Sequence, residues 1–132
     1  MIFPPPPAQW ISNKPGRNFV LIHGMVMAPA FWTVFAPDIT LQGRTVAYPL
    51  PGHHPWSLPV PGASLTADEV VDAMARAITR DFSGEPVNLV GHSTGGFLSL
   101  LLAVRRPDLV RSVVLLGGFA CGRFEGKERF AA

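Results

Sequence analysis

Short apolar runs alternate along the chain with longer segments in which apolar residues recur every three or four positions. The first run covers residues 19–23 and ends at Gly24, and similar runs cover residues 45–48, 87–90 and 113–116. A continuous apolar run of this length, bounded by turn residues, is typical of a strand that is buried on both faces of a parallel sheet. The sequence therefore predicts buried strands at these places.

Two helices are predicted between the first three strands. Pro29 suits the first turn of a helix that runs to about Leu41. Thr66 and Glu69 have the spacing of a capping box, and apolar residues then repeat at helical intervals. This second pattern predicts an amphipathic helix that ends near Arg80.

A third helix is expected after residues 87–90. It should stop near Arg106, because Pro107 cannot continue it. Strands and helices that alternate with short connections are typical of an α/β fold. We therefore expect a predominantly parallel sheet of about four strands with flanking helices.

The chain has 132 residues, enough for one domain with a modest core. The predicted core covers residues 19–118. A proline-rich leader, residues 1–18, precedes it and is expected to be stiff and inert. The tail, residues 119–132, has no clear period.

Composition and charge exclude several classes of function. The net charge is +2 without a basic run, so no nucleic-acid binding is expected. A single cysteine, Cys121, rules out an internal disulfide. The N-terminus lacks a signal-peptide pattern, and no apolar stretch approaches the roughly 20 residues of a membrane span. We expect a cytoplasmic protein without membrane contact, cofactor or metal site.

The most informative motif directly follows the third apolar run. Residues 91–96 read G-H-S-T-G-G, a G-x-S-x-G pattern between a predicted strand and a predicted helix. In that context Ser93 is expected at the apex of a sharp turn, in a strained backbone conformation. Gly91 and Gly95 lack the Cβ atoms that would collide there. The hydroxyl of Ser93 would then lie beside the N–H groups of a helix start, which favour negative charge. The alternative is a glycine-rich turn that carries an ordinary serine.

Further pieces accompany this motif. They are residues 19–24 with Phe31-Trp32, residues 43–48 with Pro51-Gly52-His53, and the strand that ends at Leu116-Gly117-Gly118. Together, in this order and spacing, the pieces resemble the N-terminal half of the α/β-hydrolase family, in its serine esterase and lipase-like branch. The resemblance implies a truncated α/β-hydrolase core.

The resemblance also implies roles for single residues. Ser93 matches the catalytic nucleophile of the family. The backbone N–H groups of Met25 and Thr94 match the two donors of an oxyanion hole, the pair of hydrogen bonds that stabilises a developing oxyanion. The rest of the turn that carries the nucleophile, the nucleophile elbow, is matched by Gly91, His92, Gly95 and Gly96.

A serine nucleophile needs a histidine that takes its proton and an acid that orients this histidine. In the family both follow the serine along the chain. No histidine follows Ser93 in this sequence. The acids that follow it are Asp108, which is expected in a surface turn, Glu125 and Glu128. The sequence therefore favours two hypotheses: a fragment of a longer enzyme, or a shortened protein with another role.

The four histidines that precede Ser93 are expected to be non-catalytic. His23 should support the geometry of the loop that follows it, and His92 should pack beside the elbow. His53 and His54 lie in the loop after the second predicted strand, and two neighbouring ligands alone do not make a metal site.

Two functions remain open. The first is a serine hydrolase, similar to carboxylesterases and lipases, for small or medium ester substrates, with weak or no activity in this chain alone. Its preference for apolar esters rests on Met25, Val26, Met27, Phe31 and Trp32. The second is a non-catalytic module that keeps the hydrolase fold and binds a ligand or a protein. A lyase or acyltransferase would use the same residues as the hydrolase. The open edge of the last strand also predicts self-association.

Overall fold

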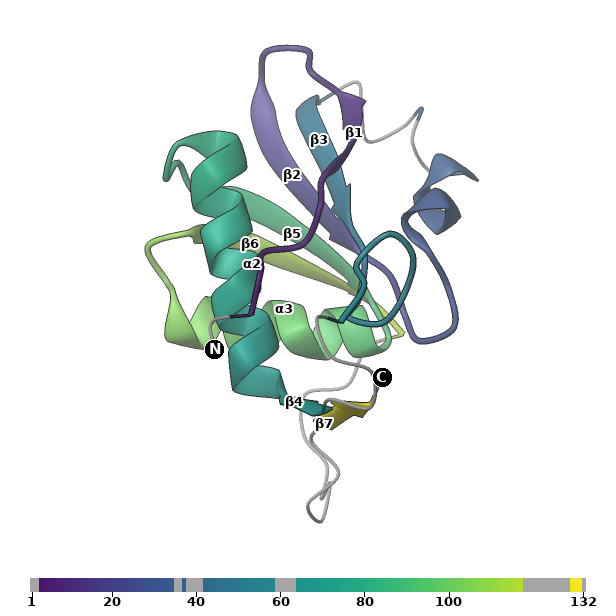
Figure 1. The fold of residues 1–132 in the computed structure, drawn as a ribbon. Coiled ribbons are helices and arrows are strands. Elements are labelled where there is room, and N and C mark those ends of the chain that lie inside the picture. Colours follow the sequence, from purple (N-terminus) through teal and green to yellow (C-terminus); the bar gives the residue numbers. More distant parts are fainter. Residues whose placement is uncertain (1–2, 35–36, 38–41, 59–63, 118–128, 132) are drawn as a thin grey trace.

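Within the described residues of this computed structural model, five strands form the central sheet (Figure 1). The structure describes all residues except 1–2, 35–36, 38–41, 59–63, 118–128 and 132. The strands of the sheet are β1 (Gln9–Ser12), β2 (Arg17–Ile22), β3 (Gly43–Tyr48), β5 (Val87–His92) and β6 (Val110–Leu116). Their order is β1-β3-β2-β5-β6, and all are parallel except β1, which runs antiparallel to β3. The four strands predicted from apolar runs are confirmed as β2, β3, β5 and β6.

The described helices are the 3-10 helix η1 (Pro29–Val34) and the α-helices α2 (Ala67–Phe82) and α3 (Thr94–Arg105). The predicted capping box is confirmed at the start of α2. The Thr66 hydroxyl accepts the Glu69 N–H at 3.2 Å, and the Glu69 carboxylate accepts the Thr66 N–H at 2.9 Å. The helix predicted from Pro29 to Leu41 begins at the expected residue as η1, and most of its remainder lies outside the described residues.

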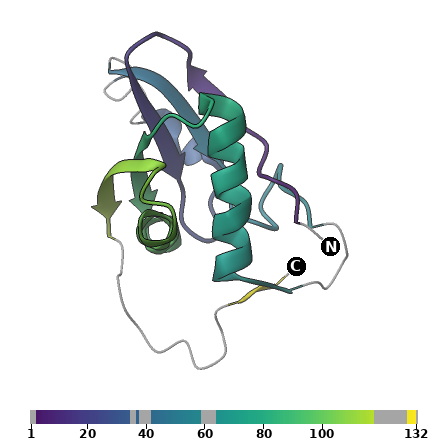
Figure 2. The ribbon, with the colours of Figure 1, turned by 90° about the vertical axis from the view of Figure 1, so that its left-hand side faces the viewer.

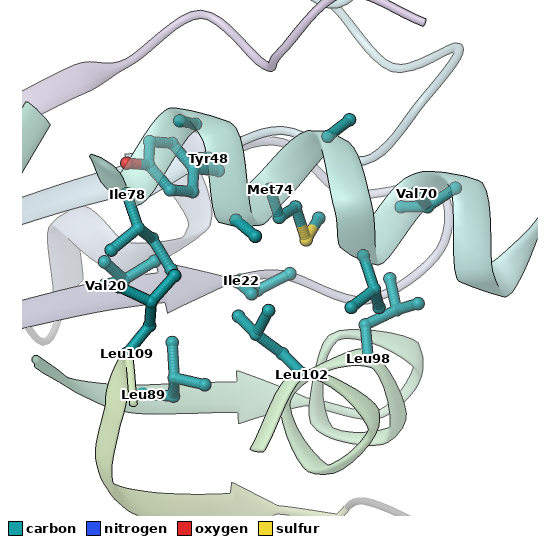
Figure 3. Close-up of a cluster of buried hydrophobic side chains, with 14 of the residues drawn as sticks. Val20, Ile22, Tyr48, Val70, Met74, Ile78, Leu89, Leu98, Leu102 and Leu109 are labelled. Atoms are coloured by element: carbon teal, nitrogen blue, oxygen red, sulfur yellow. The ribbon is translucent and has the colours of Figure 1, made fainter. Parts of the chain in front are cut away.

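Both α-helices cover the same face of the sheet (Figure 2). On this face Ile22 of β2 belongs to one cluster with Met74 of α2 and Leu102 of α3 (Figure 3). Leu21 points to the opposite face and packs with Trp32 of η1. Because successive side chains of a strand point to opposite faces, β2 is buried on both of them, as its apolar run predicted.

β1 lies in the segment that we expected to be an inert leader. Trp10 of β1 pairs with Val46, so this strand extends the sheet beyond β3. Further upstream, Phe3 is buried against the ring of Trp56, whose Nε1–H donates to the carbonyl oxygen of Pro4 at 3.2 Å. The described part of the leader is therefore built into the fold, which corrects the expectation, and the sheet has one strand more than predicted.

A second, two-stranded sheet joins β4 (Ser64–Thr66) to β7 (Arg129–Ala131) in antiparallel orientation. β7 lies in the tail, where the sequence predicted no element. The pairing brings this end of the chain beside the start of α2 (Figure 1). The rest of the tail, which includes Cys121, lies outside the described residues.

The carboxyl ends of the central strands meet at one edge of the sheet. Ile22 of β2 pairs with Tyr48 of β3 on one side and with Gly91 of β5 on the other. The segments that follow these three strands therefore lie side by side, at the edge where open α/β sheets commonly bind ligands. None of the helices in the described part of the chain could cross a lipid bilayer.

Candidate active site

Ser93 occupies the turn between β5 and α3, as the sequence predicted. Its backbone has φ 52° and ψ −116°, a combination that residues with a side chain rarely adopt and that costs on the order of 1–3 kcal/mol. The main chain around it is fixed by hydrogen bonds. The Ser93 N–H donates to the carbonyl oxygen of Leu116 at 3.2 Å, and the Ser93 carbonyl accepts the N–H groups of Gly96 and Phe97 at 2.9 and 3.1 Å. Its hydroxyl makes no hydrogen bond within the described residues, so it remains available to a ligand.

Two glycines make this turn possible. A Cβ atom on Gly91 would lie 2.5 Å from the carbonyl oxygen of Gly95. A Cβ atom on Gly95 would collide with the carbonyl oxygen of Ile22 and would lie 2.6 Å from that of His23. All of these neighbours are backbone atoms that cannot rotate away. The start of α3 therefore packs directly on the end of β2, which only glycine permits.

The loop after β2 lies against the elbow on its other side. A Cβ atom on Gly24 would lie 2.8 Å from Nδ1 of His92, the residue before Ser93. The ring of His92 also contacts the ring of Phe31, with 5.0 Å between the ring centroids. These contacts place Gly24, the first residue of the predicted oxyanion loop (residues 24–27), against the residue that precedes Ser93.

His23 fixes the orientation of this loop. Its buried ring accepts the Leu50 N–H at Nε2, at 3.1 Å, so the proton of the neutral ring lies on Nδ1 and donates to the carbonyl oxygen of Gly24 at 2.7 Å. In a trans peptide the C=O and N–H bonds point in opposite directions. The Met25 N–H therefore points away from the His23 ring. The hydrogen bonds confirm the predicted support of the loop by His23.

The two predicted oxyanion donors are both unoccupied in the described part of the chain. The N–H groups of Met25 and Thr94 donate to no described acceptor. Thr94 is the first residue of α3, where an N–H group has no partner within its own helix. Met25 lies in the loop that packs against the elbow.

His53 has a structural role that the sequence analysis missed. Its Nε2 accepts the Val26 N–H at 2.9 Å, and its Nδ1–H donates to the carbonyl oxygen of Pro51 at 3.1 Å. Its ring lies 5.3 Å from that of His23, measured between centroids. The only signal in the sequence was the match of Pro51-Gly52-His53 to the family, which carried no contact information.

The structure describes two of the remaining candidates, Asp108 and His54. Asp108 is exposed in the turn between α3 and β6, as expected, where hydrogen bonds from Arg106 hold the pKa of its carboxyl below the ordinary value. Glu125 and Glu128 lie outside the described residues. His54 is exposed. Within the described residues, no three potential metal ligands gather in one place.

Several apolar side chains in the segment that follows β2 are exposed. Met25 is 47% exposed and Val26 is 93% exposed, and Met27 and Val34 are exposed as well. Trp32, which the sequence analysis also counted as a candidate for substrate contact, is fully buried in the core. It packs the sheet and cannot line an open site.

A sheet that is mostly parallel, with a strained serine in the turn between a parallel strand and a helix, defines a class of α/β proteins. The family model described as the alpha/beta hydrolase fold matches residues 17–126. The chain belongs to this α/β-hydrolase family.

Curated relatives give the same family and carry specific activities in their names. The probable lysophospholipase BODYGUARD 1 of Arabidopsis thaliana is 34% identical over 80% of this chain and 23% of its own length. The pimeloyl-[acyl-carrier protein] methyl ester esterase of Methylococcus capsulatus is 35% identical over 78% of this chain and 37% of its own length. The chain therefore spans between about a quarter and two fifths of these relatives.

Solved structures share the fold. A carboxylesterase from the thaumarchaeon Nitrososphaera gargenis superposes with a TM-score of 0.77 at 21% identity, over 92% of this chain and 44% of the other. At this identity the likeness establishes the fold alone, and it supports the α/β assignment of the sheet and its helices.

Proposed function

We propose that this chain carries the nucleophile of a serine hydrolase that cleaves carboxylic esters. The observation that carries the proposal is the backbone of Ser93, which is strained at the carboxyl edge of β5 with its hydroxyl unbonded within the described residues. Strain of this kind persists only where surrounding contacts enforce it, and it is common at active sites. The relatives that are named as esterases and lysophospholipases favour ester substrates.

In the proposed reaction, Oγ of Ser93 attacks the carbonyl carbon of the ester while a base takes its proton. The carbonyl oxygen becomes an oxyanion and accepts hydrogen bonds from the N–H groups of Met25 and Thr94. The bond to the alcohol then breaks, and the alcohol leaves with the proton. Water hydrolyses the acyl-serine in a second step. Each oxyanion donor of this type contributes about 3–4 kcal/mol of transition-state stabilisation.

The base is not supplied by His23 or His53. In each ring one nitrogen donates to a carbonyl oxygen and the other accepts a backbone N–H, so neither has a nitrogen left for the serine proton. No histidine follows Ser93 in the sequence. We therefore expect this chain alone to hydrolyse activated esters weakly or not at all.

A fluorophosphonate probe tests the nucleophile. The chain is incubated with the probe, with and without imidazole as an external base, and the modified residue is identified by mass spectrometry. We expect imidazole-dependent labelling of Ser93 that is lost in Ser93→Ala. The control Ser57→Ala, a change at an exposed loop serine, should label like the unmodified chain.

Labelling that persists in Ser93→Ala would contradict the proposal. Absence of labelling at Ser93 under both conditions, and in any longer natural chain that contains these residues, would favour the alternative. In that case the chain would be a non-catalytic module that keeps the fold of the family and binds a ligand or a protein.

A further inference from the structure

The loop of residues 24–27 holds an unusual backbone conformation at Val26. Its φ is 57°, in the left-handed region that β-branched residues rarely adopt. The Val26 side chain is 93% exposed, so packing does not hold it there. Two described hydrogen bonds hold this turn: the Met27 N–H donates to the carbonyl oxygen of Gly24 at 3.3 Å, and the Val26 N–H donates to Nε2 of His53 at 2.9 Å. The bond to His53 is the one that ties the turn to another part of the chain.

His53 is itself held in place for this contact. Its Nδ1–H donates to the carbonyl oxygen of Pro51, which leaves Nε2 as the acceptor for Val26. Its ring contacts that of His23, which binds the carbonyl oxygen of Gly24 in the same loop. The two histidines therefore hydrogen-bond to the loop on both sides of Met25, His23 at Gly24 and His53 at Val26.

We propose that His53 is a positioning residue for the oxyanion loop, and that loss of its Nε2 acceptor releases Val26 and disorders the Met25 N–H donor. The catalytic meaning of this inference rests on the proposed function. A side chain at residue 53 that offers no acceptor would leave the Val26 N–H without this hydrogen bond.

Amide hydrogen exchange at Val26, read by mass spectrometry at residue resolution and corrected for intrinsic rates, tests the proposal. In the unmodified chain we expect the Val26 amide to be about tenfold better protected than in His53→Leu, which has no acceptor. His53→Gln keeps a side-chain acceptor and should restore most of this protection.

Two further variants make the test independent of general damage to the fold. His54→Gln changes the neighbouring exposed histidine and should behave like the unmodified chain. Val26→Gly relieves the left-handed strain, so the double variant Val26→Gly/His53→Leu should regain the loop conformation that His53→Leu alone loses. Equal exchange at residue 26 in the unmodified chain and in His53→Leu would overturn the proposal.

The exchange measurement does not require a reactive serine, so it separates the two hypotheses. In a Ser93→Ala background the same pattern at Val26 is expected. A normal exchange pattern without labelling of Ser93 would reject the proposed function alone. Labelling of Ser93 together with Val26 exchange that is unchanged in His53→Leu would reject the positioning role alone.

Discussion

Nε2 of His23 accepts the backbone N–H of Leu50 at 3.1 Å and so ties the end of β2 to the segment that follows β3. This bond requires a neutral ring. Burial, with smaller contributions from His53 and His92, lowers the pKa of His23 below its ordinary value of 6.5, although the bond to Gly24 opposes the shift. The core beside the candidate site therefore contains a histidine that resists protonation.

Acid is expected to destabilise the chain through His23. Because the pKa of His23 is lower in the folded chain than in the unfolded one, the unfolded chain binds more protons once the pH falls below about 6.5. The contribution of His23 to the free energy of unfolding should therefore be fully present above that pH. It should decrease as the pH falls toward the folded-state pKa. Urea unfolding at a series of pH values measures this slope. In His23→Gln the slope should be smaller, and an unchanged slope would assign the acid sensitivity to other groups.

The elements that the sequence predicted are those that local patterns encode. The capping box of Thr66 and Glu69 lies within four consecutive residues, and the elbow around Ser93 lies within six. Each pattern reflects a requirement of its own backbone. The capping box provides acceptors for N–H groups at a helix start, and the elbow needs glycines that lack a Cβ atom. Such requirements can be read without knowledge of the partner segments, and both were confirmed as local structure.

The features that the sequence did not predict depend on distant partners. β1 is a short edge strand behind a proline tract, and its pairing of Trp10 with Val46 leaves no periodic pattern. The bond between Val26 and His53 spans 27 positions and joins two loops. A histidine in a loop carries no local sign of which amide it accepts, so its role emerged only from the three-dimensional arrangement.

Gly95→Ala should disrupt the candidate site more than an ordinary surface change. The new Cβ atom would collide with the backbone of Ile22 and His23, and relief requires α3 to move away from β2. We expect a loss of about 2 kcal/mol or more in the free energy of unfolding, together with loss of any Ser93 labelling. Val104→Ala, on the exposed face of the same helix, should change stability by less than about 0.5 kcal/mol. A fully stable Gly95→Ala chain would mean that the helix start has room that the structure does not show.

Tyr48 should ionise only when the chain unfolds. Its ring is buried, and its hydroxyl donates to Oδ2 of Asp81 at 2.8 Å. Burial, followed by this bond, raises the pKa of Tyr48 well above its ordinary value. The contribution of Tyr48 to the free energy of unfolding is therefore present below the unfolded-state pKa of about 10, and it decreases as the pH rises beyond that value.

The chain contains a single tyrosine, so tyrosinate absorbance reports Tyr48 without overlap. In an alkaline titration the absorbance should rise together with the loss of helical circular dichroism. In Asp81→Asn, which keeps an acceptor and removes the negative charge, both transitions should remain coupled. Ionisation at about pH 10 in a chain that keeps its helical signal would contradict the buried position of this hydroxyl.

The edge of β6 is the expected site of self-association. In the order of the described strands β6 lies at the end of the sheet, and its last three residues are exposed, with Val114 50% accessible. An unpaired strand with apolar side chains favours pairing with a second copy. Val114→Lys should raise the dissociation constant of any oligomer by about tenfold or more, as measured by sedimentation velocity over a concentration series. Val104→Lys places the same charge on α3, at a residue that is 78% exposed, and should leave association unchanged. If both variants weaken association equally, net charge rather than the strand edge controls it.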